Sequence, residues 1–167
     1  MAQLRGVCHV GIGAKDPAAL AAFYRDVMGM TVTGGSEAGS DFGACAFLSS
    51  RPGEENHEIV FFADRRYAHT AFRVDSLGEL RARYRVVVDR GIAVKHVVNH
   101  GCSLAFYFDD PEGNMIEVYW ATNVDNWQPY GDPVDLAASE AELLADVERV
   151  ARETGARAAA AGHPSQL

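Results

Sequence analysis

The chain has 167 residues, of which 48% are hydrophobic and 23% are charged. This length suits one domain on the usual scale of about 100 to 200 residues, and the composition excludes a wholly disordered chain. The 15 basic residues against 23 acidic ones give a net charge of −8, and no basic run is long enough to neutralise a row of phosphates, so we expect no nucleic-acid partner. No apolar run approaches the roughly 18 to 20 residues of a membrane span, and the N-terminal residues lack the apolar core of a signal peptide. We therefore expect a cytoplasmic protein with no membrane partner.

The first half of the chain predicts a strand, a helix and further strands. Residues 7–30 combine a short apolar strand with an amphipathic helix, which an Asp-Pro pair begins and a glycine ends. Residues 41–49 and 57–62 follow as strand-like runs on either side of the turn segment RPGEEN. Together these elements predict a βαβββ module over residues 5–63.

The same order of elements returns in the second half. Residues 67–92 again predict a strand and a helix, and two strand-like runs then flank the turn segment DPEGN. In both copies a strand histidine precedes a helix tyrosine by fifteen positions, His9 before Tyr24 and His69 before Tyr84. The chain therefore contains an internal repeat.

The repeat predicts how the domain is organised. A sheet that is apolar on one face cannot bury that face alone, so we expect the first module and a second over residues 67–122 to enclose a shared interior. This gives one α+β domain over residues 1–122. Residues 123–167 predict a loop and a C-terminal helix, because Ser139 and Glu142 form a capping box ahead of apolar residues at helical spacing.

Three polar side chains occupy matched strand positions in the repeat. His9 and His69 open equivalent strands, and aligning the asparagines of the two turns sets Glu117 opposite Ile59, so we expect Glu117 to share the inward parity of an apolar residue. Three uncompensated polar groups in one interior are costly, so packing alone does not account for them. Two imidazoles and a carboxylate are the ligand set of a non-haem Fe(II) site. The sequence therefore predicts a metal site of His9, His69 and Glu117.

The paired modules, the two histidines and the segment DPEGNMIEVYW resemble the vicinal oxygen chelate superfamily over about residues 5–122. That family includes extradiol dioxygenases, glyoxalase I, methylmalonyl-CoA epimerase and metal-free drug-sequestering proteins. The resemblance implies two βαβββ modules built around a metal site.

Further residues resemble the type I extradiol dioxygenases in particular. They are His57 before the second metal histidine, the segment Asn99-His100-Gly101 after the second helix, and Tyr107 ten residues before Glu117. The resemblance implies that His57 is the acid–base group, and that His100 and Tyr107 donate hydrogen bonds to the substrate oxygen or the developing anion.

The resemblance also implies the cofactor and the substrates. It points to Fe(II), with Mn(II) as a possible occupant of the same triad, and to ring cleavage of a catechol by O2. The single pair of modules is similar to small L-DOPA 2,3-dioxygenases of antibiotic pathways. An amino-acid catechol needs a carboxylate partner, for which Arg73 is the first candidate and Arg51, Arg65, Arg66 and His96 are alternatives.

Two alternatives belong to other classes. A glyoxalase-like isomerase would need a fourth ligand on the last strand of the first module, where the alignment sets Ile59 and gives Glu58 the opposite parity. A drug-binding protein similar to bleomycin-resistance proteins would generally lack the ligand set. Whichever function applies, the dioxygenase included, the expected assembly is a homodimer, by resemblance to other small members of the family.

Overall fold

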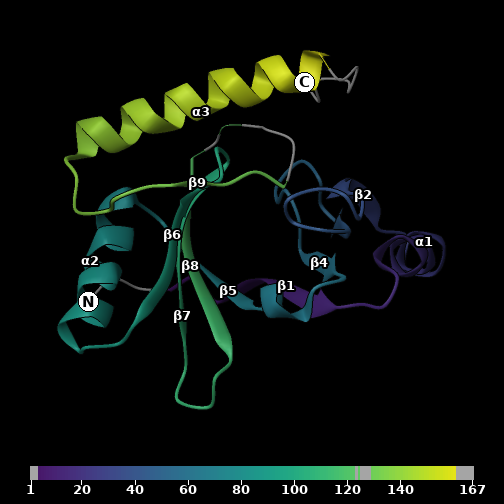
Figure 1. Cartoon of the computed structure of the whole chain (residues 1–167), viewed down its shortest axis with the longest axis horizontal. Helices are drawn as coiled ribbons and strands as arrows, with labels where there is room; N and C mark the ends of the chain where they lie inside the picture. The colour runs from purple at the N-terminus through teal and green to yellow at the C-terminus, as the bar shows by residue number, and fades with distance from the viewer. Residues whose placement is uncertain (1–3, 123, 125–128, 161–167) are drawn as a thin grey trace. The chain divides into compact units, whose positions relative to one another are not determined.

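The computed structural model describes residues 4–122, 124 and 129–160 (Figure 1). Contacts divide the chain into two compact units, residues 7–71, here the N-terminal unit, and residues 1–6 with 72–167, here the C-terminal unit. Within the described residues, three α-helices accompany nine β-strands, so the expected α+β class is confirmed. No helix in this described part of the chain is long and apolar enough to cross a membrane.

The N-terminal unit has the predicted βαβββ order. Its elements are β1 (Val7–Gly13), α1 (Pro17–Met28), β2 (Thr31–Ser36), β3 (Cys45–Ser49), β4 (Ile59–Phe62) and the short 3-10 helix η1 (Arg65–Tyr67). The strands lie in the order β2-β3-β4-β1, with β4 parallel to β1 and the other neighbours antiparallel. The strand expected from residue 41 begins only at Cys45, because residues 41 and 42 belong to a turn.

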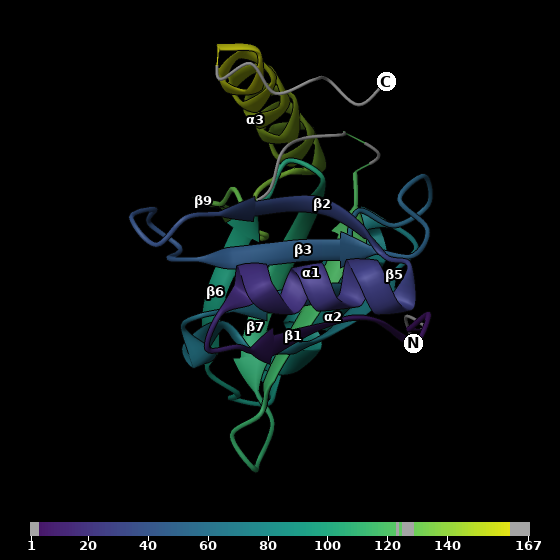
Figure 2. The same cartoon turned by 90° about the vertical axis from the view of Figure 1, so that its right-hand side faces the viewer.

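Helix α1 begins and ends where the sequence predicts. The Asp16 side chain accepts a hydrogen bond from the Ala19 backbone N–H, and Gly29 ends the helix in the left-handed conformation with φ of 71°. The helix runs along β3 (Figure 2) and also packs against β4, where its Ala21 joins Leu48 and Phe61 in an apolar cluster. This cluster covers one face of the sheet. Phe47, Val60 and Phe62 lie on the other face.

The C-terminal unit repeats the order and adds an extension. Its elements are β5 (Thr70–Val74), whose first two residues fall in the N-terminal unit, α2 (Leu77–Asp89), β6 (Val94–Asn99), β7 (Ser103–Asp109), β8 (Met115–Ala121), β9 (Asp132–Pro133) and α3 (Glu140–Ala160). The strands follow the order β5-β8-β7-β6-β9. Leu80 of α2, Phe106 of β7 and Val118 of β8 form the centre of the core.

Helix α3 packs into this same core. Ser139 and Glu142 exchange the hydrogen bonds of the predicted capping box, and Leu143 and Val147 are buried against α2 and the sheet. The helix lies next to β6 (Figure 1). Burial of each of these side chains contributes about 1.5 to 3 kcal/mol, so the extension is an integral part of the C-terminal unit. The domain boundary expected at residue 122 stays a prediction.

Candidate active site

His9 and His69 lie side by side in the N-terminal unit. His9 is the third residue of β1, and His69 just precedes β5, where its backbone N–H and C=O both pair with Gly11 of β1 at 3.2 and 2.8 Å. This pairing brings the two Nε2 atoms to 3.1 Å from each other. The histidines of the two repeats, sixty residues apart, thus meet as the sequence predicts.

The hydrogen bonds around His69 fix which nitrogen faces His9. Its Nδ1–H donates to the Tyr67 carbonyl at 2.7 Å, since a carbonyl oxygen only accepts. A neutral His69 therefore presents the Nε2 lone pair to His9. Two nitrogens bound to one ion at about 2.1 Å and at about 90° lie roughly 3.0 Å apart, so the pair has the spacing of adjacent ligands of an octahedral metal. An outer hydrogen bond to a carbonyl is also the usual support of a ligand histidine.

Gly11 provides the space for this arrangement. A Cβ at that position would lie 2.9 Å from His69 Nδ1 and 2.9 Å from a ring carbon of Phe62. Any larger residue would push the imidazole away from its position. The sequence contained this signal as a glycine two residues after a candidate ligand, but a single sequence gives no reason to select it.

His57 lies against the histidine pair. Its ring centroid is 4.3 Å from that of His9 and 5.0 Å from that of Phe47, on the face of the sheet opposite to α1. Its Nδ1–H donates to the Asn56 side-chain oxygen at 2.9 Å, which leaves Nε2 as a base in the neutral ring. His57 precedes β4 instead of starting that strand. The N-terminal unit therefore gathers three of the predicted site residues.

The predicted parity of Ile59 and Glu58 is wrong. Gly11 pairs with Val60 in the parallel ladder, so the face of His9 and Gly11 carries Val60 and, by alternation, Glu58, whereas Ile59 packs toward α1. Aligning the repeats on their asparagines shifted the register by one residue. The Glu58 carboxylate accepts hydrogen bonds instead from the Ser50 hydroxyl, from the Ser50 backbone N–H at 2.6 Å and from Arg51 at 2.9 Å. These bonds lower the pKa of Glu58, that of the Ser50 hydroxyl most.

Tyr107 and Glu117 face each other in the C-terminal unit. They are direct cross-strand partners in the β7–β8 ladder, on the face opposite to the core residues Phe106 and Val118. Glu117 is only 3% exposed. Burial raises the pKa of Tyr107 well above its usual value, and the charge of Glu117 and a hydrogen bond to it raise it further. Tyr107 therefore remains protonated as a hydrogen-bond donor.

His100 lies next to Tyr107 and is hydrogen-bonded to it. Its Nδ1–H donates to the Tyr130 carbonyl at 2.5 Å, and its Nε2 lies 2.9 Å from the Tyr107 hydroxyl. A neutral His100 therefore accepts at Nε2, and an imidazolium donates there. The C-terminal unit thus brings together His100, Tyr107 and Glu117.

Arg73 lies in β5 and is partly buried. Its backbone carbonyl accepts a hydrogen bond from the Arg5 N–H at 3.0 Å. Its assignment to a substrate carboxylate stays a prediction.

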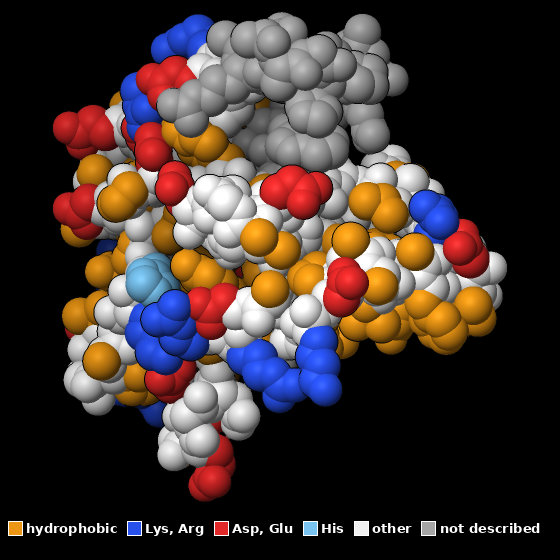
Figure 3. All heavy atoms as spheres, turned by 45° about the vertical axis from the view of Figure 1, so that its right-hand side comes forward, with side chains coloured by type: hydrophobic (Ala, Val, Ile, Leu, Met, Phe, Trp, Pro, Cys, Tyr) orange, Lys and Arg blue, Asp and Glu red, His pale blue; other side chains and the backbone are white. Residues whose placement is uncertain are grey.

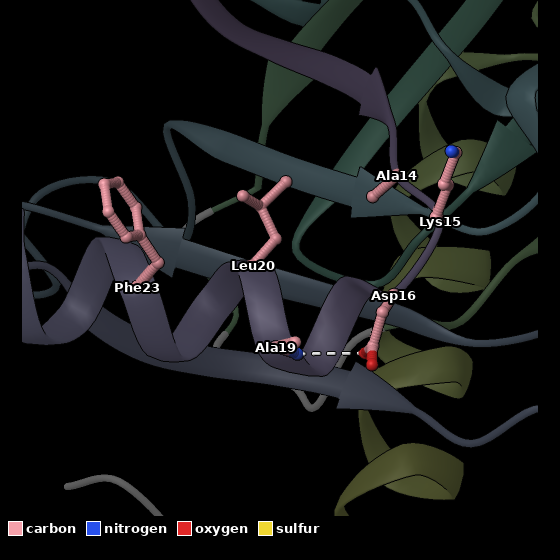
Figure 4. Close-up of a pocket in the computed structure, with 6 residues that line it drawn as sticks. All are labelled: Ala14, Lys15, Asp16, Ala19, Leu20 and Phe23. Carbon is pink, nitrogen blue, oxygen red and sulfur yellow. Dashed lines mark hydrogen bonds between the residues drawn. The ribbon is translucent and has the colours of Figure 1, made fainter.

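A hollow on the surface lies elsewhere. It runs along α1 and is lined by Ala14, Lys15, Asp16, Ala19, Leu20 and Phe23 (Figure 4). None of the predicted site residues lines it. It is shallow and open, with no cluster of acid–base groups, so its shape gives no reason to place the chemistry there.

Comparison with known proteins places the chain in a family. Residues 6–118 match the Glyoxalase/Bleomycin resistance protein/Dioxygenase superfamily, and the chain belongs to it. A curated relative, biphenyl-2,3-diol 1,2-dioxygenase 3 of Rhodococcus globerulus, is 28% identical over 146 residues, which cover 80% of this chain and 70% of that protein. The expected superfamily is therefore confirmed.

Solved structures agree with this fold. A catechol 2,3-dioxygenase is similar with a TM-score of 0.61 and 19% identity, covering 81% of this chain and 49% of its own. The Mn(II)-bound glyoxalase of Novosphingobium aromaticivorans is similar with a TM-score of 0.53 and 25% identity, covering 72% and 40%. The chain thus spans less than half the length of these two proteins. The curated relative is thus named as a dioxygenase of an aromatic diol, and solved structures of such dioxygenases share the fold.

Proposed function

We propose that the chain is a metal-dependent extradiol dioxygenase that opens the ring of a catechol with O2. The observation that carries this proposal is the convergence of His9 Nε2 and His69 Nε2 at 3.1 Å, with the outer nitrogen of His69 bound to a carbonyl. Membership of the superfamily and the dioxygenase names among the relatives support the class of reaction.

His9, His69 and Glu117 are the proposed ligands. Each offers one ligand atom, two imidazole nitrogens and a carboxylate oxygen. This donor set fits a divalent ion and suits Fe(II) oxygen chemistry. A bound Fe(II) would supply the place where a catechol chelates through both oxygens and O2 is activated. Mn(II) fits the same donors, because selectivity follows geometry and availability more than raw affinity.

The remaining site residues have proposed roles as acids, bases and donors. His57 is the proposed acid–base group, because its ring lies against that of His9 and an imidazole, with an unperturbed pKa of about 6.5, suits proton transfer near neutral pH. The Tyr107 hydroxyl has one proton, which it donates to Nε2 of a neutral His100 at rest and to the substrate oxygen when the catechol binds, so His100 sets the resting orientation of that hydroxyl. In the overall reaction both atoms of O2 enter the product, the carbon–carbon bond beside the diol breaks, and a hydroxymuconic semialdehyde forms.

L-DOPA is the proposed substrate, with Arg73 as the partner of its carboxylate. The support is the resemblance to small single-pair enzymes, together with the position of Arg73 on β5, four residues after His69. An unpaired substrate carboxylate would be costly to bury, so an arginine near the ligand strands is the expected feature of an amino-acid pocket.

The direct test loads the purified chain with Fe(II) without oxygen and then admits air with catechol or L-DOPA. We expect a yellow semialdehyde and matching O2 uptake, faster with L-DOPA. Arg73→Met would raise the KM for L-DOPA and leave the KM for catechol unchanged. If the iron stays bound and neither diol consumes O2, the dioxygenase proposal fails.

A glyoxalase-like isomerase is the second candidate. Two observations favour it: Glu58 lies on the face of His9, where a fourth ligand would be needed, and the Mn(II)-bound glyoxalase has a similar fold. The bonds of Glu58 to Ser50 and Arg51 weigh against it. Turnover of a glutathione hemithioacetal by the Mn(II)-loaded chain, without O2 uptake, would select this function.

The expected homodimer is also a proposal, and α1 offers the surface for it. Phe23, Val27 and Met28 are 54%, 62% and 64% exposed, and Figure 3 shows hydrophobic side chains gathered over this helix. Ala19 lies four residues before Phe23, and Val27 lies four residues after it. If two antiparallel copies of α1 met about a two-fold axis at Phe23, the Val27 of each copy would pack against the small Ala19 of the other. Light scattering after gel filtration tests this: we expect a dimer, converted to a monomer by Phe23→Ser.

A further inference from the structure

The segment of His100 is tied to the C-terminal extension. Asn99 is fully buried, and its side-chain oxygen accepts from the Gly101 backbone N–H at 2.8 Å. Its side-chain nitrogen donates to Asp146 of α3 at 2.9 Å. The residue that precedes His100 thus has its side chain fixed between the loop and the helix.

A second tie holds the imidazole itself. β9 pairs with β6, so that Asp132 lies opposite Asn99, and the Tyr130 carbonyl just before β9 receives His100 Nδ1–H at 2.5 Å. A Cβ on Gly131 would lie 2.9 Å from Val98 and 3.5 Å from His100 Nδ1, so this stretch packs closely on the ring. The Tyr130 carbonyl therefore selects one tautomer of His100.

One guanidinium joins the two ties. Arg149 of α3 donates from Nη2 to Asp132 at 3.1 Å and to Asp146 at 2.7 Å, and its Nε also donates to Asp146 at 2.9 Å. The Tyr130 hydroxyl donates to the same Asp132 oxygen at 2.9 Å. Arg149 thus links the carboxylate that holds Asn99 to the carboxylate that holds the Tyr130 side chain. We call Arg149, Asp132 and Asp146 the clamp.

We infer that Arg149 is a positioning residue that keeps the His100 imidazole in its Nδ1–H tautomer, with Nε2 facing the Tyr107 hydroxyl. The inference rests on the proposed function, in which the one hydroxyl proton of Tyr107 turns from His100 Nε2 to the substrate oxygen. Arg149 has this effect through Asp132 and Asp146, the two other residues of the clamp. The C-terminal extension then serves the reaction as well as the core.

The clamp contributes less to the stability of the docked helix than the buried side chains of α3 do. The Arg149 side chain is 39% exposed, and exposed ion pairs contribute little to the free energy of folding. The buried side chains of Leu143, Val147 and Val150 hold α3 in place independently of the arginine. Loss of the guanidinium therefore releases the Tyr130 and Asn99 contacts while the helix remains docked.

The first test reads the His100 ring in the metal-free protein. Histidine side chains labelled with 15N report the tautomer, and His100→Gln assigns the signal. We expect a slowly exchanging Nδ1–H in the wild type and in Arg152→Met, a control on the same helix whose side chain is 71% exposed. In Arg149→Met we expect that proton to exchange about tenfold faster, which corresponds to the net contribution of about one hydrogen bond. Arg149→Lys, which keeps the charge but loses the planar fork, would fall between the two.

The second test uses the Fe(II)-loaded enzyme. We expect Arg149→Met to lower kcat for catechol about 10- to 100-fold with the KM unchanged within about twofold, and Arg149→Lys to restore part of the loss. An Nδ1–H exchange rate in Arg149→Met equal to that of Arg152→Met overturns the inference whatever the activity. If the wild type cleaves no diol, the proposed function fails, and the exchange measurement still decides whether the clamp holds His100.

Discussion

Gly11 lies directly beneath the His69 imidazole, where a Cβ would come within 2.9 Å of Nδ1. We expect Gly11→Ala to displace His69 from the Tyr67 carbonyl and to weaken metal binding about 10- to 100-fold, the usual cost of a lost supporting contact. Calorimetric titration of the apo protein with Fe(II) under nitrogen measures this. Gly39→Ala is the matched control, because a Cβ at position 39 would meet nothing within 4 Å. Equal affinities in the two variants would contradict the role assigned to Gly11.

The three proposed ligands are expected to act as one set. His9→Ala, His69→Ala and Glu117→Ala would each lose both bound iron and ring cleavage, because two remaining donors hold a divalent ion poorly. Elemental analysis of the protein after gel filtration measures the iron. One equivalent of tightly bound iron in any of these variants removes that residue from the ligand set.

His57 is expected to affect turnover and not the metal. Its ring lies 4.3 Å from that of His9, and its Nδ1–H donates to Asn56. His57→Ala would keep one equivalent of iron and lose about 10²- to 10⁴-fold in kcat, as for a missing general acid–base group. Iron content and O2 uptake are measured on the same sample. Normal turnover would show that another group moves the proton.

Asp110 is expected to make stability depend on pH at the β7–β8 turn. Its side chain accepts from the Asn114 side chain at 2.8 Å and from the Glu112 and Asn114 backbone N–H groups at 2.9 Å, with the Asn114 bonds as the largest cause of its lowered pKa. The contribution is present above the unfolded pKa of about 3.9 and is lost as pH falls through the lower folded pKa. Thermal melts would therefore show Asp110→Ala less stable than the wild type at neutral pH, and the difference would shrink below about pH 4. A difference that stays constant to pH 2 would rule out this carboxylate as the source.

The repeat allowed most of the fold to be predicted. Strand alternation and helix caps are local signals, so Asp16 caps the start of α1 and Gly29 caps its end as expected. The matched positions of His9 and His69 in the repeat also predicted that the two side chains meet, as they do. The register of β4 was predicted wrongly, because an alignment on turn asparagines carries an error of one residue, and one residue exchanges the faces of Glu58 and Ile59.

The residues that hold the site residues in position could not be predicted from the sequence. Gly11 matters because of a ring that lies fifty-eight positions further along the chain, and Arg149 because of carboxylates that come together only when β9 pairs with β6. Neither residue belongs to a local pattern. Contacts that tertiary packing creates leave no periodic trace in one sequence.

The short strand β9 also changes how the protein meets other molecules. It covers the outer side of β6 at Val98 and Asn99, where unpaired backbone groups would otherwise form a sheet edge. An open edge is a template for pairing with a strand of another chain. Removal of residues 129–167 would uncover it together with the apolar residues that Leu143 and Val147 bury. We therefore expect a chain cut before residue 129 to aggregate more readily than the whole chain.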